Sequence, residues 1–356
     1  MNWPWRSSES EGVLLRALWF PMSVLSWFYR LGAKAHLAGY ERGWNKARRV
    51  DARVVSVGSL VAGGSGKTPV ASWLAERLHR RGHKVAILSR GYRGEPEELV
   101  TIVSDGNRVY AGAKHAGDEP VVLAGQVAGV PVIVSKDRGL AALRAIALYC
   151  AEVLILDDGF QHHRLHRDLD LLTFDGVFGV GNGSVLPRGP LREPLASLER
   201  ADAIIEIDGD LSQELSMEIS RTASLAVRWS GRRVPVGLRD LNGSVTVSPE
   251  VLRGMRVGMI AGIAHPDSLR RTLESLGAVV VSQRTFRDHH RYRRADLRGL
   301  SEEAAIWITT EKDAGKILEG WTGGVDVRVL SVRVSMTDGE AFVQWIEGEL
   351  GLDGVR

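Results

Sequence analysis

The stretch Ser59-Leu60-Val61-Ala62-Gly63-Gly64-Ser65-Gly66-Lys67-Thr68 is a glycine-rich turn that ends in Gly-Lys-Thr, and it decides the fold. A β-branched run at 53–57 precedes it, and apolar residues at helical spacing follow it from 69 to 81. Strand, glycine-rich turn and helix form the setting in which backbone N–H groups surround a phosphate. We therefore predict a P-loop at 61–68, with Lys67 on the β- and γ-phosphate oxygens and Thr68 as a Mg²⁺ ligand.

The spacing of this loop departs from the usual pattern at one position. Val61 stands five residues before Gly66, where a P-loop normally has glycine. Gly63 and Gly64 would supply the necessary backbone freedom instead. The alternative is an ordinary turn with a chance Gly-Lys-Thr, and the strand and helix on either side argue against it.

Length and composition indicate an ordinary globular protein. The 356 residues are 44% hydrophobic and 25% charged, which is enough for two domains of unequal size. A single cysteine, Cys150, excludes an internal disulfide and favours a reducing compartment. Because it ends an apolar helical run at 140–150, we predict that Cys150 is a small core residue.

The first 50 residues are basic and rich in tryptophan. They hold eight basic and three acidic residues, a net charge of +5, whereas the whole chain carries only +3. Half of the tryptophans also lie here: Trp3, Trp5, Trp19, Trp27 and Trp44. Indole rings and cations are both favoured at the headgroups of an anionic bilayer. The uncharged run at 17–29 is shorter than the roughly 20 residues of a spanning helix, and Pro21 interrupts it.

This segment instead has the pattern of an interfacial helix. Arg16, Ser23 and Arg30 would form a narrow polar stripe, with Ser26 beside it, and leave a broad apolar face. We predict a helix that lies in the plane of the membrane interface. Two alternatives are a helix packed on the protein core and a signal peptide cleaved after Ala33-Lys34-Ala35. The nucleotide loop downstream argues against the signal peptide.

Acidic residues follow a later apolar strand. Residues 153–156 run directly into Asp157 and Asp158. A carboxylate at a strand end downstream of the phosphate loop holds Mg²⁺ or its water in P-loop enzymes, so we predict a metal site of Thr68, Asp157 and Asp158. Three histidines come next, namely His162, His163 and His166. Without a cysteine or a second cluster, we expect them to be solvated or hydrogen-bonded rather than metal ligands.

Two further segments carry polar residues beside expected strands and helices. Arg90-Gly91-Tyr92-Arg93-Gly94 follows a strand at 83–89, at the end where open α/β sheets place ligands. It either binds phosphate or is a solvated loop. Gly117-Asp118-Glu119-Pro120 precedes a helix at 121–127, and its two carboxylates either cap that helix or take part in catalysis.

Several motifs occur together in one order along nearly the whole chain. They are the segments 57–69, 88–94, 117–120, 156–162, Leu186-Pro187-Arg188-Gly189-Pro190-Leu191-Arg192-Glu193-Pro194, 261–264, Asp288-His289-His290 and Thr310-Glu311-Lys312-Asp313. In this order they resemble the tetraacyldisaccharide 4'-kinase family, which phosphorylates an acylated glucosamine disaccharide in the lipid A pathway. That family departs from the usual P-loop spacing in the same manner, so Val61 does not count against the loop.

The resemblance implies an α/β fold with a P-loop NTPase-type sheet domain and a second, smaller α/β lobe. The implied divisions are an N-terminal interfacial helical arm at 1–45, the ATP-binding kinase domain at 46–223, the β-linker strands and smaller lobe at 224–334, and a C-terminal helix at 335–356 that returns to the first domain. The linker strands would lie at 224–229 and 327–334, where residues alternate in the manner of a strand.

The implied activity is ATP- and Mg²⁺-dependent phosphorylation of the 4'-hydroxyl of a tetraacylated glucosamine disaccharide 1-phosphate. The partners would be this lipid and the cytoplasmic face of the inner membrane, bound peripherally, and not nucleic acid. Lys67 and Asp118 would be catalytic together with a histidine of the Asp-His-His segment, for which His289 is favoured over His290. The expected substrate contacts are Arg90, Arg93, Arg138, Gln161, Arg192 and Glu193, since guanidinium groups suit phosphate.

Two other classes of protein share part of this pattern. A membrane-tethered GTPase or ATPase switch would share the loop, the Asp157 region and the basic arm. Guanine recognition usually needs Asn-Lys-x-Asp, and Thr310-Glu311-Lys312-Asp313 has its lysine in the wrong place. A DHH-type phosphoesterase would share Asp288-His289-His290, but it needs aspartate and histidine clusters where this chain has a P-loop.

Overall fold

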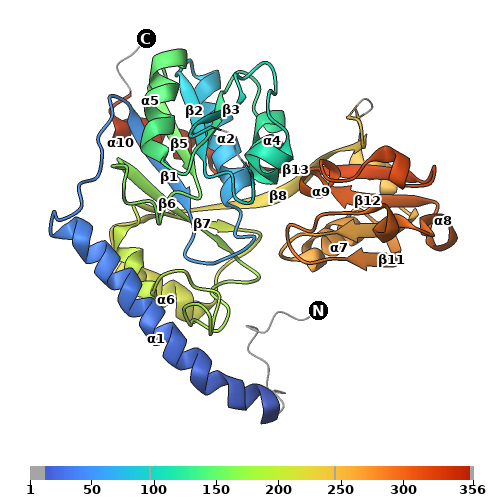
Figure 1. Ribbon diagram of the computed structural model, residues 1–356, viewed down its shortest axis with the longest axis horizontal. Helices are drawn as coiled ribbons and strands as arrows, with labels where there is room; N and C mark the ends of the chain where they lie inside the picture. The colour runs from blue at the N-terminus through green and yellow to red at the C-terminus, as the bar shows by residue number, and fades with distance from the viewer. Residues whose placement is uncertain (1–12, 96–97, 244–245, 353–356) are drawn as a thin grey trace.

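The structure, a computed structural model, describes residues 13–95, 98–243 and 246–352. Within these residues, 13 strands form one continuous sheet that runs through two lobes (Figure 1). The order along the sheet is β11-β10-β12-β13-β8-β7-β6-β1-β5-β2-β4-β3, and β9 pairs with β8. The expected α/β class, with a sheet domain, a second, smaller α/β lobe and an N-terminal helix, is confirmed.

The first domain is a parallel sheet with helices on both faces and one antiparallel edge strand, β3. Its strands are β1 Arg53–Gly58, β2 Val85–Ser89, β3 Thr101–Ser104, β4 Val132–Val134, β5 Val153–Asp157, β6 Leu169–Asp175 and β7 Ala203–Ile207. Its helices are α2 Lys67–Arg80, α3 Ala113–Ala116, α4 Asp118–Gln126, α5 Arg138–Tyr149 and α6 Gln213–Thr222, with a 3₁₀ turn at Leu195–Arg200.

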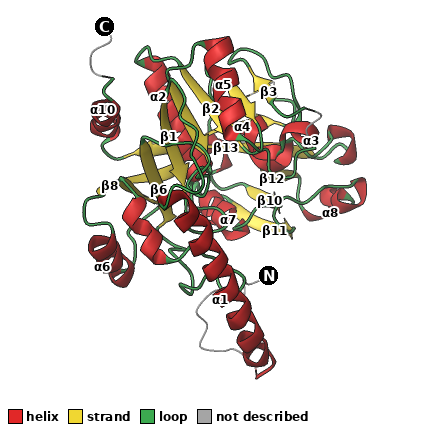
Figure 2. Ribbon diagram, turned by 60° about the vertical axis from the view of Figure 1, so that its left-hand side comes forward, coloured by secondary structure: helices red, strands yellow, loops and turns green. Residues whose placement is uncertain are grey.

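Alternate residues of β1 face opposite helical layers, which the period of two in a strand requires. Val55 packs in one cluster with Leu74 of α2, whereas Val54 packs in another with Ala141 of α5. Figure 2 shows the strands between these layers. Because both faces are covered, the strands are near-continuous apolar runs, and their carboxyl ends are left as the free edge where polar residues gather.

The second lobe has its own small parallel sheet, and two long strands join it to the first domain. The lobe contains β9 Thr246–Val247, β10 Arg256–Ala261, β11 Val279–Thr285, β12 Ile306–Thr310, α7 Pro266–Ser275, α8 Leu300–Glu303 and α9 Glu311–Ala314, with 3₁₀ turns at Pro249–Leu252, Arg294–Leu297 and Glu319–Trp321. The joining strands are β8 Val227–Asp240 and β13 Asp326–Met336, which pair antiparallel. The first of them is much longer than the expected strand at 224–229, because after pairing with β7 it continues along β13.

The last helix, α10 Gly339–Leu350, lies against the first domain. Phe342 stacks on Trp73 of α2 with ring centroids 5.8 Å apart, and it also contacts Trp229 of β8 at 5.0 Å. Arg81 at the end of α2 pairs with Glu340 at 2.6 Å. These contacts hold α10 in the helical layer that covers the α2 face of the sheet.

Helix α1 Val13–Glu41 extends from the first domain as a long arm (Figure 1). Ser26 docks it: the hydroxyl donates to the Val185 carbonyl and accepts from the Arg188 N–H, both at 3.0 Å. The apolar side chains that stay outside are Val24, Leu25, Trp27, Phe28, Tyr29 and Leu31, each 41–60% exposed. Among the described residues, no helix is both long enough and apolar enough to cross a membrane.

Part of the predicted polar stripe is thus a docking face. Ser23 hydrogen-bonds the Trp19 carbonyl at 2.6 Å, and Ser26 is buried against the first domain. The side chain of Arg16 lies outside the described residues, as do Trp3 and Trp5. Ser26 therefore gives α1 a polar contact with the first domain, while several apolar side chains of the helix stay exposed.

The prediction that Cys150 is a core residue is wrong. Cys150 is exposed and caps the C-terminus of α5 in the left-handed conformation, with φ 50°. This conformation turns the chain away from the helix axis, so the last residue of the apolar run points outward. Apolar periodicity alone does not mark where the helix ends.

Candidate active site

The phosphate loop connects β1 to α2 at the free edge of the sheet. Gly63 and Gly66 have φ of 115° and 88°, values at which a side chain would be strained. Helix α2 begins at Lys67, so its unpaired N–H groups and positive dipole end face the loop. The Lys67 ammonium lies 3.3 Å from the Gly63 carbonyl, folded back across the loop. Val61 is buried and bridges to Leu191, which gives this position a packing role.

Two adjacent carboxylates at the end of β5 face the loop. The Thr68 hydroxyl donates to Asp157 at 3.1 Å, and the Lys67 ammonium lies 3.6 Å from Asp158. Burial raises the pKa of Asp157, and the charges of Glu119 and Asp158 raise it further. Burial also raises the pKa of Asp158, but Lys67 and Arg192 outweigh it and hold that pKa at about 2.

This arrangement fits a divalent cation. A hydroxyl and two carboxylates are hard oxygen donors of the kind that Mg²⁺ takes together with nucleotide oxygens. Burial and the charges of Glu119 and Asp158 raise the pKa of Asp157, and a cation bound at this position would favour the ionised carboxylate. Within the described residues, no group of three or more His, Cys, Asp and Glu side chains forms an all-protein metal site.

Two arginines support this acidic pair. Arg192 donates to both oxygens of Asp158, at 2.8 and 2.7 Å. Arg138 is 2% exposed, and its guanidinium donates to the Ser135 carbonyl at 3.3 Å and the Asp157 carbonyl at 3.5 Å. Burial lowers the pKa of Arg138, although Asp158 and Asp157 raise it in part. Both groups add positive charge behind the loop.

A carboxylate and an imidazole meet across the two lobes. Asp118 at the start of α4 is 8% exposed, and one of its oxygens lies 2.9 Å from Nδ1 of His289 in the smaller lobe. The residues lie 171 positions apart in sequence. Burial alone would raise the pKa of Asp118, but the hydrogen bond to His289 and the charge of Lys312 lower it well below its usual value.

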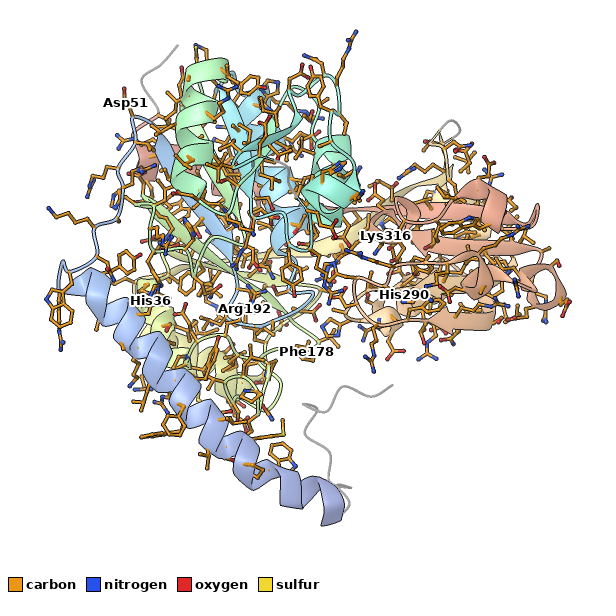
Figure 3. All side chains as sticks on the ribbon, viewed as in Figure 1. His36, Asp51, Phe178, Arg192, His290 and Lys316 are labelled. Atoms are coloured by element: carbon orange, nitrogen blue, oxygen red, sulfur yellow. The ribbon has the colours of Figure 1, made fainter. Side chains whose placement is uncertain are left out.

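Two lysines of the smaller lobe complete this cluster. Lys312 in α9 lies 2.9 Å from Glu119, and Lys316 lies 3.3 Å from Asp118. Figure 3 shows Lys316 where the smaller lobe meets the first domain. The neighbouring His290 faces away from the cluster: its ring stacks on Phe286 and bonds Asp296 at 2.9 Å. The geometry thus separates the two histidines that the sequence leaves open.

The other expected substrate contacts lie around the same edge in different settings. Arg90 is exposed, and Arg93 is exposed and donates to the carbonyls of Asp288 and His289 at 3.4 and 3.3 Å. Gln161 donates to the Ser59 carbonyl at 3.2 Å, while its side-chain oxygen is buried without a partner. Glu193 is 7% exposed and pairs with Arg200 at 2.5 Å, so its carboxylate stabilises the structure beside the site.

The three histidines after β5 are not gathered into one site. His163 is buried, accepts from Arg200 at 3.2 Å and packs on His36 and Tyr40 of α1. Burial, with the charge of Arg200, lowers the pKa of His163 to about 3, so the ring is neutral. It is a docking contact for α1. This agrees with the expected hydrogen-bonding role.

Arg233 is a site residue that the sequence analysis missed. It lies on β8, and its guanidinium donates to the Gly64 carbonyl at 2.9 Å, to Asp175 at 2.9 Å and to Asp208 at 2.6 Å. One cation therefore ties the phosphate loop to the ends of β6 and β7. A single arginine in an ordinary strand carries no motif, so nothing in the sequence pattern marks it.

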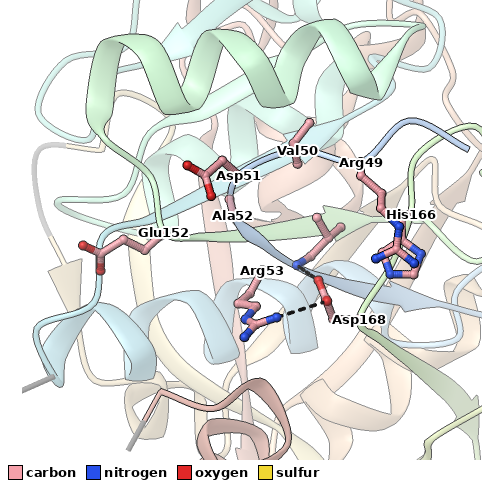
Figure 4. A pocket seen from close by; sticks show the side chains of 9 residues that line it. Arg49, Val50, Asp51, Ala52, Arg53, Glu152, His166 and Asp168 are labelled. Carbon is pink, nitrogen blue, oxygen red and sulfur yellow. Dashed lines mark hydrogen bonds and ion pairs between the residues drawn. The ribbon is translucent and has the colours of Figure 1, made fainter. Parts of the chain in front are cut away.

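A cavity also lies elsewhere in the first domain. A space of about 460 Å³ opens at the amino ends of β1 and β5, lined by Arg49–Val54, Glu152, His166 and Asp168 (Figure 4). Parallel strands bind ligands at their carboxyl ends, which is the opposite edge of this sheet. An ion pair of 3.7 Å between Arg53 and Asp168 crosses this space. We therefore assign the chemistry to the loop and the cross-lobe cluster.

The comparisons with known proteins point to one family. The sequence model of the family described as tetraacyldisaccharide-1-P 4'-kinase matches residues 18–351. A tetraacyldisaccharide 4'-kinase from Anaeromyxobacter sp. (strain Fw109-5) is 40% identical over 93% of this chain and 90% of its own. One from Syntrophus aciditrophicus (strain SB) is 40% identical over 83% of each chain. The crystal structure of LpxK from Aquifex aeolicus in complex with ATP is 31% identical and covers 94% of this chain and 99% of its own, with a TM-score of 0.75.

Proposed function

The chain belongs to the tetraacyldisaccharide-1-phosphate 4'-kinase family, and from this premise we propose which residues carry out the ATP-dependent 4'-phosphorylation of the lipid A precursor. Because the chain matches this family, we interpret it as a kinase and not as a nucleotide switch or a phosphoesterase. The observation that carries the proposal is the 2.9 Å contact between Asp118 and His289, beside the phosphate loop and across the two lobes.

Asp118 is the proposed general base. Phosphoryl transfer to an alcohol has a loose transition state, so the base chiefly orients the hydroxyl and accepts its proton late. One oxygen of Asp118 is held by His289 and Lys316, at 2.9 and 3.3 Å. The other oxygen lies 3.1 Å from the same ring nitrogen and accepts from the Glu119 N–H at 3.1 Å, so both oxygens of the carboxylate are held in place, and this second oxygen is the proposed acceptor of the hydroxyl proton. Since the partners come from different lobes, the base is complete only when the lobes are together.

The phosphate end of the reaction belongs to the P-loop. Lys67 and residues 61–68 would surround the triphosphate, and Lys67 stabilises charge on the transferring group. Thr68, Asp157 and Asp158 would hold Mg²⁺, which neutralises phosphate charge when bound. Arg192 keeps Asp158 ionised and oriented through its two bonds to that carboxylate.

The two exposed arginines of the loop after β2 are the proposed contacts for the substrate's own phosphate. Arg90 and Arg93 are exposed, and Arg93 already lies beside His289. Arg138 and Arg192 are occupied by the acidic pair, so we assign them to its charge balance. Gln161 and Glu193 are then assigned to the side of the site that lies between the phosphate loop and α1.

We also propose peripheral binding to the cytoplasmic face of the inner membrane through α1. Its exposed apolar side chains would enter the interface, where indole and phenyl rings are favoured. Burial raises the pKa of Tyr29 on the same helix, and the nearby charges of Arg192 and Glu193 lower and raise it, respectively. The helix therefore borders the site, and a lipid in the bilayer could present its sugar without leaving the interface. The proposed divisions at 1–45, 46–223, 224–334 and 335–356 follow the same plan.

The test of the dyad compares Asp118→Asn, His289→Gln and the double variant, with Asp51→Asn as a matched control. Asp51 is exposed at the opposite edge of the sheet. We expect kcat to fall at least about a hundredfold in Asp118→Asn, as for loss of a general base. The double variant should cost less than the product of the single losses, because the residues act as one unit. Strict multiplication of the two losses, or near-full activity of Asp118→Asn, would overturn the proposal.

A further inference from the structure

Lys312 lies at the centre of the charged cluster that joins the lobes. Its side chain is 20% exposed. Its ammonium lies 2.9 Å from Glu119, 3.4 Å from Asp288 and 3.3 Å from Nε2 of His289. Glu119 belongs to the first domain and the other two residues to the smaller lobe. One cation therefore bridges the lobes directly beside the Asp118–His289 pair, and the roles assigned so far leave it unused.

We propose that Lys312 is a positioning residue that fixes the tautomer of His289, with the ring proton on Nδ1 and directed at Asp118. In this role Lys312 keeps the imidazole neutral and leaves Asp118 as the proton acceptor. The inference rests on the proposed function, because it takes Asp118 as the base.

The tautomer follows from the donor chemistry of the ammonium group. An ammonium has three donors and no acceptor. The hydrogen bond between Lys312 and His289 must therefore run from lysine to Nε2, so Nε2 carries the lone pair. The proton of the neutral ring then lies on Nδ1 and is donated to Asp118, 2.9 Å away. The opposite tautomer would set an Nε2 proton against the ammonium and a lone pair against a carboxylate.

The surroundings keep Lys312 charged. Burial lowers the pKa of Lys312, but Glu119, Asp288 and Asp118 together raise it well above its usual value. The competing acceptor for an Nε2 proton is Asp288, whose oxygen lies 3.6 Å from that nitrogen. This separation is longer than a hydrogen bond, and Lys312 binds the other oxygen of Asp288.

Several charged and titratable groups surround the ring and its hydrogen-bond partners, and Lys312 sets the balance of charge among them. They are Asp118 and Glu119 of α4, Lys312, Lys316, Asp288, and Tyr92 and Arg93 of the loop after β2. Without the Lys312 charge, Asp288, which lies 3.6 Å from Nε2, and Glu119, the other partner of Lys312, would be uncompensated and would favour an imidazolium. An imidazolium bonded to Asp118 would weaken that carboxylate as a base. The acidic limb of the activity profile would therefore move to higher pH.

The experiment compares Lys312→Met, Lys312→Gln and Lys312→Arg, with Lys84→Met as the matched control. Lys84 is 59% exposed and pairs with Glu152 at 3.7 Å. The dependence of kcat on pH is measured with saturating ATP-Mg²⁺ and acylated disaccharide 1-phosphate. We expect Lys312→Met to lower kcat about tenfold at neutral pH and to raise the acidic limb by about one pH unit or more. Lys312→Arg, which keeps a donor-only cation, restores both, and Lys84→Met changes neither.

Nitrogen NMR of the His289 ring gives a readout that a structural role would not move. The signals should report a protonated Nδ1 and an unprotonated Nε2 in the unmodified chain and in Lys312→Arg, and increased protonation of Nε2 in Lys312→Met. An unchanged pH profile and unchanged ring signals in Lys312→Met would overturn the inference, as would full rescue by neutral Lys312→Gln. If Lys312→Met does not fold, the Gln and Arg variants decide between charge and shape.

Asp118→Asn, assayed in the same series, separates this inference from the proposed function. If Asp118→Asn is active, Asp118 is not the base, and the proposed tautomer of His289 then has no role in catalysis. If Asp118→Asn is inactive and Lys312→Met is unaffected, the proposed function stands and only the role of Lys312 is refuted.

Discussion

Replacing Arg233 by methionine should weaken both the fold and the binding of ATP, by amounts that the structure lets us separate. The guanidinium joins Asp175 and Asp208 to the Gly64 carbonyl of the phosphate loop. The side chains of Arg233, Asp175 and Asp208 are 21%, 10% and 28% exposed. Removing one partner of a buried ion pair lowers the free energy of unfolding by about 3–5 kcal/mol. Because this cluster is partly exposed, we expect a loss of about 2–3 kcal/mol.

A smaller part of that loss belongs to the loop itself. The hydrogen bond to the Gly64 carbonyl contributes about 1 kcal/mol, which corresponds to about a fivefold increase in the KM for ATP. The remainder is charge repulsion between Asp175 and Asp208. A second change, Asp208→Asn, should therefore restore much of the melting temperature in Arg233→Met. It should leave the KM for ATP high, because the loop has still lost its brace.

Arg232→Met is the matched control, since Arg232 is the adjacent residue of the same strand and is exposed. The assay is thermal unfolding of each variant together with initial rates across a range of ATP concentrations. If Arg233→Met matched Arg232→Met in both melting temperature and KM for ATP, the brace would have no energetic role. If Asp208→Asn restored the KM as well, the effect would be electrostatic and not mediated by Gly64.

Two further predictions concern pH and the membrane. Burial raises the pKa of Asp157 to about 7, so the apparent affinity for Mg²⁺ should fall about tenfold per pH unit below that value, measured by titration calorimetry with ATP present. Because this pKa lies above the ordinary aspartate value of 3.8, the folded metal-free protein holds an extra proton between these values and loses stability as pH rises through them. Asp157→Asn should therefore melt a few degrees higher at pH 8 without metal, whereas Asp51→Asn should not. Trp27→Ser with Phe28→Ser should lose about 3 kcal/mol of binding to anionic phosphatidylglycerol vesicles, about a hundredfold, whereas Leu148→Ser on α5 should bind normally.

Contrary results for these two have equally direct meanings. Mg²⁺ affinity independent of pH between about 5 and 8 would show that Asp157 is not a ligand whose proton must leave. Vesicle binding unchanged by the Trp27 and Phe28 substitutions would place the membrane contact elsewhere on the chain.

The phosphate loop and the acidic strand end could be predicted because their chemistry is local. A glycine turn, a lysine and a hydroxyl must be adjacent in sequence to surround a phosphate, and β5 places two aspartates at its end by simple alternation. Helix α1 could be predicted for a similar reason, since its amphipathic pattern is complete within one element. What the pattern did not predict is which serine docks the arm, because that depends on the loop around Val185.

The cross-lobe contacts could not be predicted from the pattern, because they join distant segments. Sequence reasoning alone gave capping and catalysis equal standing for Asp118, and nothing local distinguishes His289 from His290. In the structure His290 is turned toward Asp296 and Phe286, which are residues of its own lobe. Lys312 belongs to a motif of the family resemblance that assigned it no role, and Arg233 belongs to no motif.

The long strand β8 sets the geometry of the site. It pairs with β7 through Val227–Gly231 and with β13 through Gly231–Asp240, so Gly231 belongs to both pairings. A Cβ at Gly231 would lie 2.8 Å from the Met336 sulfur and 3.0 Å from the Ser335 carbonyl, which explains why glycine occupies this crossing. A slip of one residue along these strands would shift the smaller lobe by about 3.3 Å. That shift exceeds the tolerance of a 2.9 Å contact between Asp118 and His289, so the pairing of β8 with β13 decides whether the catalytic pair can form.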